Sequence, residues 1–109
     1  MTSIWELPIL LFMRVIAKRT LREFYRSHPD ARGPLLAWHD TLAKADWKSW
    51  TDMKARFRSA DSVGNDRYVF NIKGNKYRLV AKINFPHGLV FIRFIGTHGK
   101  YDSIEPKEA

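Results

Sequence analysis

Three strand-like runs within residues 67–102 constrain the fold of this chain more than any other feature. Residues 68–72, 77–84 and 89–97 are rich in β-branched and aromatic side chains, and turn residues bound each run, which is typical of paired β-strands. Gly74-Asn75 separates the first two runs, and Pro86-His87-Gly88 separates the last two. The simplest arrangement is a three-stranded antiparallel meander with a polar exit at residues 97–102.

Alternation along the runs predicts two different sheet faces, because successive side chains of a strand point in opposite directions. In residues 77–84, Leu79 and Ala81 point to one face, and Arg78 and Lys82 point to the other. In the last run, the same rule places Val90, Ile92 and Phe94 on the apolar face. It places four residues on the cationic face, namely Phe91, Arg93, Ile95 and Thr97. Cations among apolar side chains favour an anion-accepting surface.

The charge balance favours a polyanionic partner. The 109 residues suffice for one domain, and 19 Lys and Arg against 11 Asp and Glu leave a net charge of +8. Nucleic acid is therefore the leading partner. An anionic membrane fits less well, because no helical pattern combines a wide basic face with a wide apolar face.

Several classes of chemistry are not expected. The chain has no cysteine, so disulfides, thiol nucleophiles and thiolate metal sites are excluded, and its four histidines do not have zinc-binding spacing. The glycine-rich motifs of nucleotide-binding proteins and the nucleophile motif of α/β-hydrolases are absent. The sequence predicts no metal and no cofactor.

The first twelve residues are mostly apolar but lack the features of a signal peptide, and the apolar run at residues 7–12 is too short to span a bilayer. We expect a cytoplasmic protein that does not contact the membrane. Residues 1–12 are interpreted as an added strand or as an N-terminal extension from an upstream start codon, in which case we expect the domain to begin at Met13. The predicted domain spans residues 13–104, and the charged residues 105–109 are predicted to be a flexible tail.

The remaining patterns predict an α+β fold. Residues 13–17 read as a strand, and Leu21, Phe24 and Tyr25 share one face of a short helix. The buried stripe of the next helix is predicted to comprise Leu35, Trp38, His39 and Leu42. Another short helix is predicted near residues 47–57, and a small strand near residues 60–63. The order predicts an N-terminal strand and two to three helices packed on one face of an antiparallel meander.

Residues 71–81 (NIKGNKYRLVA), residues 91–98 (FIRFIGTH) and Tyr101-Asp102 carry a resemblance to a known family. They closely resemble the HigB-type toxins of bacterial toxin-antitoxin modules, within the RelE-like superfamily of ribosome-dependent messenger-RNA endonucleases. The resemblance extends from Met13 to about Ile104. It implies a RelE-like fold, cleavage of mRNA on the ribosome, and inhibition by a cognate antitoxin, usually a HigA-type helix-turn-helix protein.

The resemblance also implies a reaction, which is metal-free attack of a ribose 2′-hydroxyl on the adjacent phosphate. This reaction needs a proton acceptor, cations near the phosphoryl oxygens and a donor near the leaving oxygen. His98 is the candidate acid or base, because histidine changes charge near neutral pH. Arg78 and Arg93 are the candidate phosphate clamp, and Tyr101 is predicted to stack on a base or position the 2′-hydroxyl.

Other residues are assigned to RNA binding or to structure. The predicted RNA-binding residues are Lys73, Lys76, Lys82 and Asn71. Asp102 either orients His98 or caps the chain end. We interpret three tryptophans (Trp38, Trp47 and Trp50) and three histidines (His28, His39 and His87) as structural. A basic run is either a solvated face or a surface for ribosomal RNA phosphates, and it comprises Arg14, Lys18, Arg19, Arg22 and Arg26.

Two other functions are compatible with the residues. The first is a non-catalytic RNA- or DNA-binding module that uses the same basic face. The second is a partner-binding protein whose cationic face meets an acidic antitoxin tail without catalysis.

Overall fold

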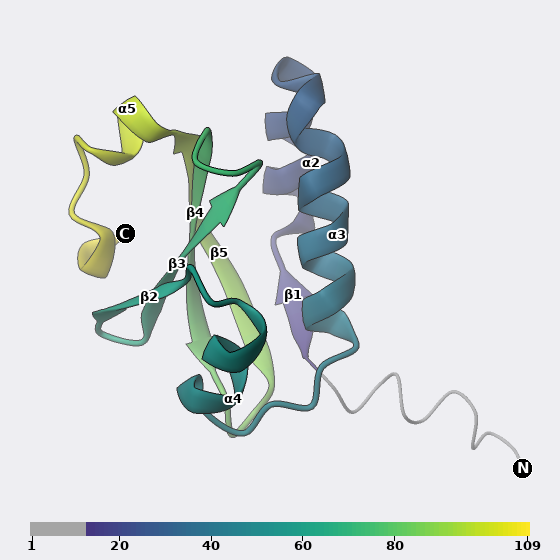
Figure 1. Cartoon of the computed structure of the whole chain (residues 1–109), viewed down its shortest axis with the longest axis vertical. Helices are drawn as coiled ribbons and strands as arrows, with labels where there is room; N and C mark the ends of the chain where they lie inside the picture. The colour runs from purple at the N-terminus through teal and green to yellow at the C-terminus, as the bar shows by residue number, and fades with distance from the viewer. Residues whose placement is uncertain (1–12) are drawn as a thin grey trace, which may run out of the picture.

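The structure, a computed structural model, describes residues 13–109 and has two layers, a five-stranded sheet and a layer of helices (Figure 1). The predicted extension at residues 1–12 lies outside the described residues. Strands β1 (Arg14–Ile16), β2 (Asp61–Gly64), β3 (Arg67–Ile72), β4 (Tyr77–Asn84) and β5 (Leu89–Thr97) form the sheet. Their spatial order is β1-β5-β4-β3-β2. β1 runs parallel to β5 and the other neighbours are antiparallel, so the predicted α+β fold and its meander are confirmed.

The helices between β1 and β2 cover one face of the sheet (Figure 1). They are α2 (Lys18–Ser27), the short 3-10 helix η1 (Pro29–Ala31), α3 (Arg32–Ala43) and α4 (Trp50–Arg56). No helix within residues 13–109 is long and apolar enough to cross a membrane.

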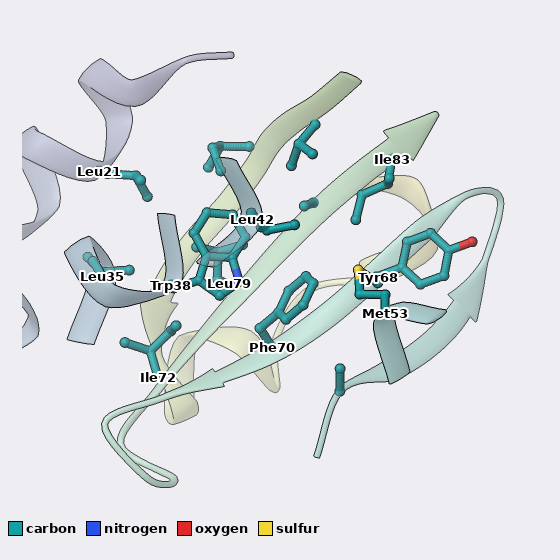
Figure 2. Close-up of a cluster of buried hydrophobic side chains, with 14 of the residues drawn as sticks. Leu21, Leu35, Trp38, Leu42, Met53, Tyr68, Phe70, Ile72, Leu79 and Ile83 are labelled. Carbon is teal, nitrogen blue, oxygen red and sulfur yellow. The ribbon is translucent and has the colours of Figure 1, made fainter. Parts of the chain in front are cut away.

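The core lies between these helices and the meander (Figure 2). Leu35 and Leu42 of α3 are fully buried, and Trp38 packs edge-on against Phe70 of β3 with 5.3 Å between ring centroids. Trp47 and Trp50 likewise pack on aromatic rings of the core. The predicted structural role of these three tryptophans is therefore confirmed. Burying apolar side chains of this size is the main favourable contribution to folding.

A β-bulge corrects the predicted faces of β5. Val80 pairs with Phe94 and Ala81 pairs with Ile92, so Arg93 is an extra residue without a partner on β4. An extra residue reverses the alternation beyond it. Phe94 was predicted on the apolar face but lies on the cationic face, whereas Ile95, predicted on the cationic face, packs against the core.

The C-terminal segment folds over the cationic face, which we define as the sheet face that carries Arg67, Arg78, Lys82, Phe91, Arg93 and Phe94. Helix α5 (His98–Tyr101) and the 3-10 helix η2 (Pro106–Glu108) lie on this side (Figure 1). Arg67 and Arg93 both donate hydrogen bonds to the main-chain oxygen of Ala109. Where a flexible tail was predicted, the structure therefore shows defined contacts. Apolar side chains on this face are also buried, since Val69 is 4% exposed and Val80 is 0% exposed.

Candidate functional site

The candidate site lies where β5 ends and α5 begins. The Thr97 side-chain oxygen caps α5 by accepting a hydrogen bond from the Lys100 backbone N–H at 3.3 Å. The backbone N–H of His98 donates to the carbonyl of Lys76, at the start of β4, at 3.2 Å. These two contacts fix the backbone of His98 at the end of the sheet.

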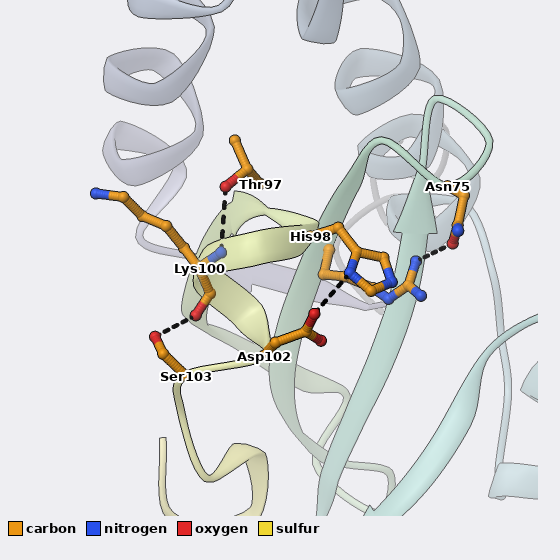
Figure 3. A network of polar contacts seen from close by, with 7 residues as sticks. Asn75, Thr97, His98, Lys100, Asp102 and Ser103 are labelled. Carbon is orange, nitrogen blue, oxygen red and sulfur yellow. Dashed lines mark hydrogen bonds and ion pairs between the residues drawn. The ribbon is translucent and has the colours of Figure 1, made fainter.

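His98 and Asp102 form a side-chain pair across this helical turn (Figure 3). Nδ1 of His98 lies 3.1 Å from Oδ2 of Asp102, and the two side chains are 41% and 61% exposed. Of the two predicted roles for Asp102, this geometry matches the one that orients His98. A carboxylate at Nδ1 favours the tautomer that carries the proton there, which leaves Nε2 for proton exchange with a substrate.

Arg78 lies beside this pair on β4, opposite Gly96 of β5. Its Nη1 donates to the side-chain oxygen of Asn75 at 2.6 Å, and its guanidinium carbon lies 5.7 Å from the centre of the Tyr101 ring. The contact with Asn75 restrains the orientation of the guanidinium and leaves other N–H groups for an anion.

Tyr101 contributes a protonated phenol and an aromatic surface. Burial raises the pKa of the Tyr101 hydroxyl, nearby Arg78 opposes the increase, and the carboxylates of Asp61, Asp102 and Glu105 add to it. The group therefore stays a hydrogen-bond donor at neutral pH. Its ring centre lies 6.3 Å from that of Phe94, so two aromatic side chains adjoin the Arg78 guanidinium.

The other predicted catalytic residue, Arg93, lies further along the cationic face. Arg78 is opposite Gly96, whereas Arg93 occupies the bulge opposite Val80 and donates from Nε to the Ala109 oxygen at 3.2 Å. The structure therefore groups His98, Arg78 and Tyr101 together and places Arg93 with Arg67. Lys82 is on the same face, paired with Arg67 on β3.

The other predicted RNA-binding residues are placed elsewhere. Lys76 forms an ion pair with Asp30 of η1, and its ammonium lies 5.4 Å from the centre of the Tyr77 ring. Lys73 and Asn71 line a hollow of about 180 Å³ between the end of β3 and helices α3 and α4, together with Arg56 and Thr41. Lys76 still contacts His98 through its main-chain carbonyl, and Asn71 pairs with Arg78 in the β3–β4 ladder.

Sequence reasoning did not assign Asn75 and Phe94 to the site. Asn75 was identified only as a turn residue, although an amide three residues before an arginine in a tight turn can reach its guanidinium. Phe94 was assigned to the core because alternation was counted through the bulge. Within residues 13–109, no group of three or more His, Asp or Glu side chains is placed to hold a metal ion.

Comparisons with known proteins identify the family. The profile of the HigB toxin, described as the RelE-like toxic component of a toxin-antitoxin system, matches residues 31–104. The mRNA interferase toxin HigB of Escherichia coli (strain K12) is 34% identical over 92 residues, which cover 83% of this chain and 88% of that protein. The mRNA interferase HigB of Shigella flexneri matches equally well. A third relative, the mRNA interferase HigB of Escherichia coli O6:H1, is 28% identical over 94 residues, or 84% of this chain and 91% of that protein.

These matches cover most of the meander and the His98 turn, and they confirm the resemblance identified from the sequence. This chain belongs to the HigB toxin family, the RelE-like toxic components of toxin-antitoxin systems.

Proposed function

We propose that this chain is an mRNA interferase that cuts messenger RNA on the ribosome, with its reaction centre at His98, Arg78 and Tyr101. The observation that carries the proposal is the contact of His98 with Asp102 beside an Arg78 guanidinium held by Asn75. This arrangement offers a proton acceptor and a cation at one end of an exposed sheet. The names of the relatives, mRNA interferases, support the same reaction.

The proposed reaction uses protein side chains throughout. Nε2 of His98 takes the proton of a ribose 2′-hydroxyl, and the resulting oxygen attacks the adjacent phosphorus. Arg78 stabilises the negative charge on the phosphoryl oxygens, and the protonated Tyr101 donates a hydrogen bond to the same group. The bond between phosphorus and the 5′ oxygen breaks, and that oxygen takes a proton from water. Protonated His98 later returns its proton to the solvent, and the products are a 2′,3′-cyclic phosphate and a 5′-hydroxyl.

The rest of the cationic face is proposed to bind the RNA strand on either side of the cut. Arg93 and Lys82 extend the positive charge of Arg78 along the sheet, and Arg93 donates to a main-chain oxygen that an RNA phosphate can replace. Lys73 and Asn71 are proposed to contact a flanking nucleotide in the hollow that they line. Lys76 is proposed to contact RNA only when its ion pair with Asp30 is broken.

Two macromolecular partners complete the proposal. The basic run on β1 and α2 is proposed to contact ribosomal RNA, because phosphate contacts of this kind need charge rather than sequence recognition. The second partner is a cognate antitoxin of the HigA type, a helix-turn-helix protein, which follows from the place of this family in toxin-antitoxin systems.

The test is to induce the chain in translating cells and map newly formed mRNA ends that carry a 5′-hydroxyl. We expect cuts inside coding regions with the wild type and a loss of about 10²-fold or more with His98→Gln, since general acid-base groups contribute effects of this size. His87→Gln is the matched control, because His87 lies in the β4–β5 turn and contacts only Asn84 there. Arg78→Gln is compared with Arg58→Gln in the same way.

Growth arrest with intact transcripts would favour the alternative function, a non-catalytic RNA- or DNA-binding module. Cuts that persist unchanged in both His98→Gln and Arg78→Gln would remove these residues from the reaction.

A further inference from the structure

An apolar groove runs between α2 and α3. Its volume is about 120 Å³, and its apolar lining consists of Leu21, Tyr25, Leu35 and Leu36. Leu36 is 44% exposed, and no other large hydrophobic side chain within residues 13–109 is as exposed. An apolar hollow with an exposed leucine at its edge is the kind of surface that a partner covers.

The rim of this α2–α3 groove is positively charged. Lys18 and Arg22 line it, and Arg32 lies 5.8 Å from the centre of the Tyr25 ring. On the same helix, Glu23 pairs with Arg19 at 3.1 Å and so does not neutralise the cations that line the groove. Burial lowers the pKa of His39, which also lines the groove, and nearby Lys18 adds to the effect. The fitting occupant is therefore apolar in its centre and acidic at its edges.

These features fit a protein helix better than RNA. Single-stranded RNA is held by aromatic faces on which bases stack. Of the two aromatic rings in the groove, Tyr25 already has a guanidinium over it and His39 is a half-buried imidazole. An amphipathic helix instead places apolar anchors three and four residues apart into such a groove, while acidic side chains reach the cationic rim.

We propose that the α2–α3 groove is the docking site for an acidic, amphipathic helix of the cognate antitoxin. The inference rests on the proposed function in one respect, namely that the chain works as a toxin with an antitoxin partner. The groove lies on the helical side of the sheet, whereas α5 and its His98 lie on the opposite side (Figure 1). An antitoxin bound in the groove leaves the reaction centre exposed and covers Arg22, so it competes with the ribosome for the basic run.

The experiment measures binding by isothermal titration, with the full chain and the purified antitoxin encoded next to its gene. Leu36→Asp places a carboxylate at the apolar edge, and Arg22→Glu reverses a charge on the rim. We expect each variant to weaken binding by about tenfold or more. The matched controls are Ala55→Asp and Arg58→Glu, exposed positions in or just after α4, and both should bind like the wild type.

A second measurement separates this inference from the proposed function. Leu36→Asp should still cut mRNA in cells that lack the antitoxin, and the antitoxin should no longer protect those cells. If the wild type cuts no mRNA, the proposed function fails while the titration still tests the groove. Equal affinity of Leu36→Asp, Ala55→Asp and the wild type would overturn the inference.

Two other results would also overturn it. If Leu36→Asp changes the mass of the chain in solution from dimer to monomer and leaves antitoxin binding intact, the groove is an interface between two copies. If only ribosome binding responds to Arg22→Glu, the rim serves RNA.

Discussion

At the scale of single residues, neighbours decide what similar side chains can do. Lys76 and Arg78 are two residues apart at the start of β4, yet Lys76 contacts the Asp30 carboxylate and Arg78 contacts the neutral amide of Asn75. Lys76 is therefore largely neutralised within the fold, whereas Arg78 keeps its full charge for an anion. The first contact stabilises the fold, and the second positions a group for binding.

Asp30 carries a prediction about stability and pH. Its carboxylate accepts a hydrogen bond from the Lys76 ammonium and another, at 2.6 Å, from the hydroxyl of the buried Tyr77. Both hydrogen bonds lower the pKa of Asp30, and the one from Lys76 has the larger effect. A carboxyl whose pKa is lower in the folded state stabilises the protein above its unfolded pKa of about 4. That stabilisation is lost as pH falls through the lower, folded pKa. Asp30→Asn should therefore unfold at a lower urea concentration than the wild type at pH 7.

Urea unfolding near pH 3 and below checks the sign, because there the two proteins should converge. Asp40→Asn is the control, since Asp40 pairs with Lys44 on an exposed helix face, and such pairs contribute little. An equal loss of stability for Asp30→Asn at pH 7 and at the lowest pH would show that the ionised carboxylate is not the cause.

At the scale of elements, the bulge in β5 shapes the candidate site. It turns Phe94 onto the cationic face, where its ring lies directly over Gly96, so a Cβ on Gly96 would meet the Phe94 ring at 2.7 Å. Gly96 is also the residue opposite Arg78. A glycine is needed here for the close approach of the ring, which in turn lies next to Tyr101.

Gly96→Ala should therefore displace the Phe94 ring and disturb the aromatic surface beside Arg78. We expect mRNA cleavage to fall by about tenfold or more, since small misplacements of positioning groups have effects of this order. The added methyl group should cost about 1–3 kcal/mol of stability. Cleavage and thermal unfolding are measured together.

Gly33→Ala is the matched control, because nothing lies within 4 Å of a Cβ there and the position is helical. It should leave cleavage unchanged and stabilise the fold slightly. If Gly96→Ala cleaves as well as Gly33→Ala, the Phe94 ring has no part in the site.

The bulge also shows what the sequence could and could not predict. Strand composition and turn residues predicted β3, β4 and β5 closely, because those signals are local. The parallel pairing of β1 with β5 joins distant parts of the chain, and the bulge depends on how β4 and β5 fit together. Period-two alternation therefore assigned Arg78 to its observed face but misplaced Phe94. The four-residue helix α5 was too short to leave a periodic signal.

At the scale of the whole molecule, the two layers separate two kinds of surface. The sheet side carries the candidate reaction centre, and the helical side carries the α2–α3 groove and most of the basic run (Figure 1). A toxin that acts on the ribosome needs both a surface that holds the cut strand and a surface that holds the large particle. Under the proposed function, the second surface is α2, which carries four cations and one carboxylate.

Arg26 tests this division, because it lies on the exposed face of α2 with Arg19 and Arg22 but does not line the groove. Arg26→Glu should weaken cosedimentation with ribosomes and reduce its salt dependence, since each lost phosphate contact lowers the slope by about 1. Arg58→Glu makes the same change of charge outside α2 and should bind ribosomes like the wild type.

Antitoxin binding by Arg26→Glu should change less than antitoxin binding by Leu36→Asp, because Leu36 lines the groove and Arg26 does not. Equal ribosome affinity of Arg26→Glu and Arg58→Glu would mean that net charge, and not its position on α2, directs the toxin to the ribosome.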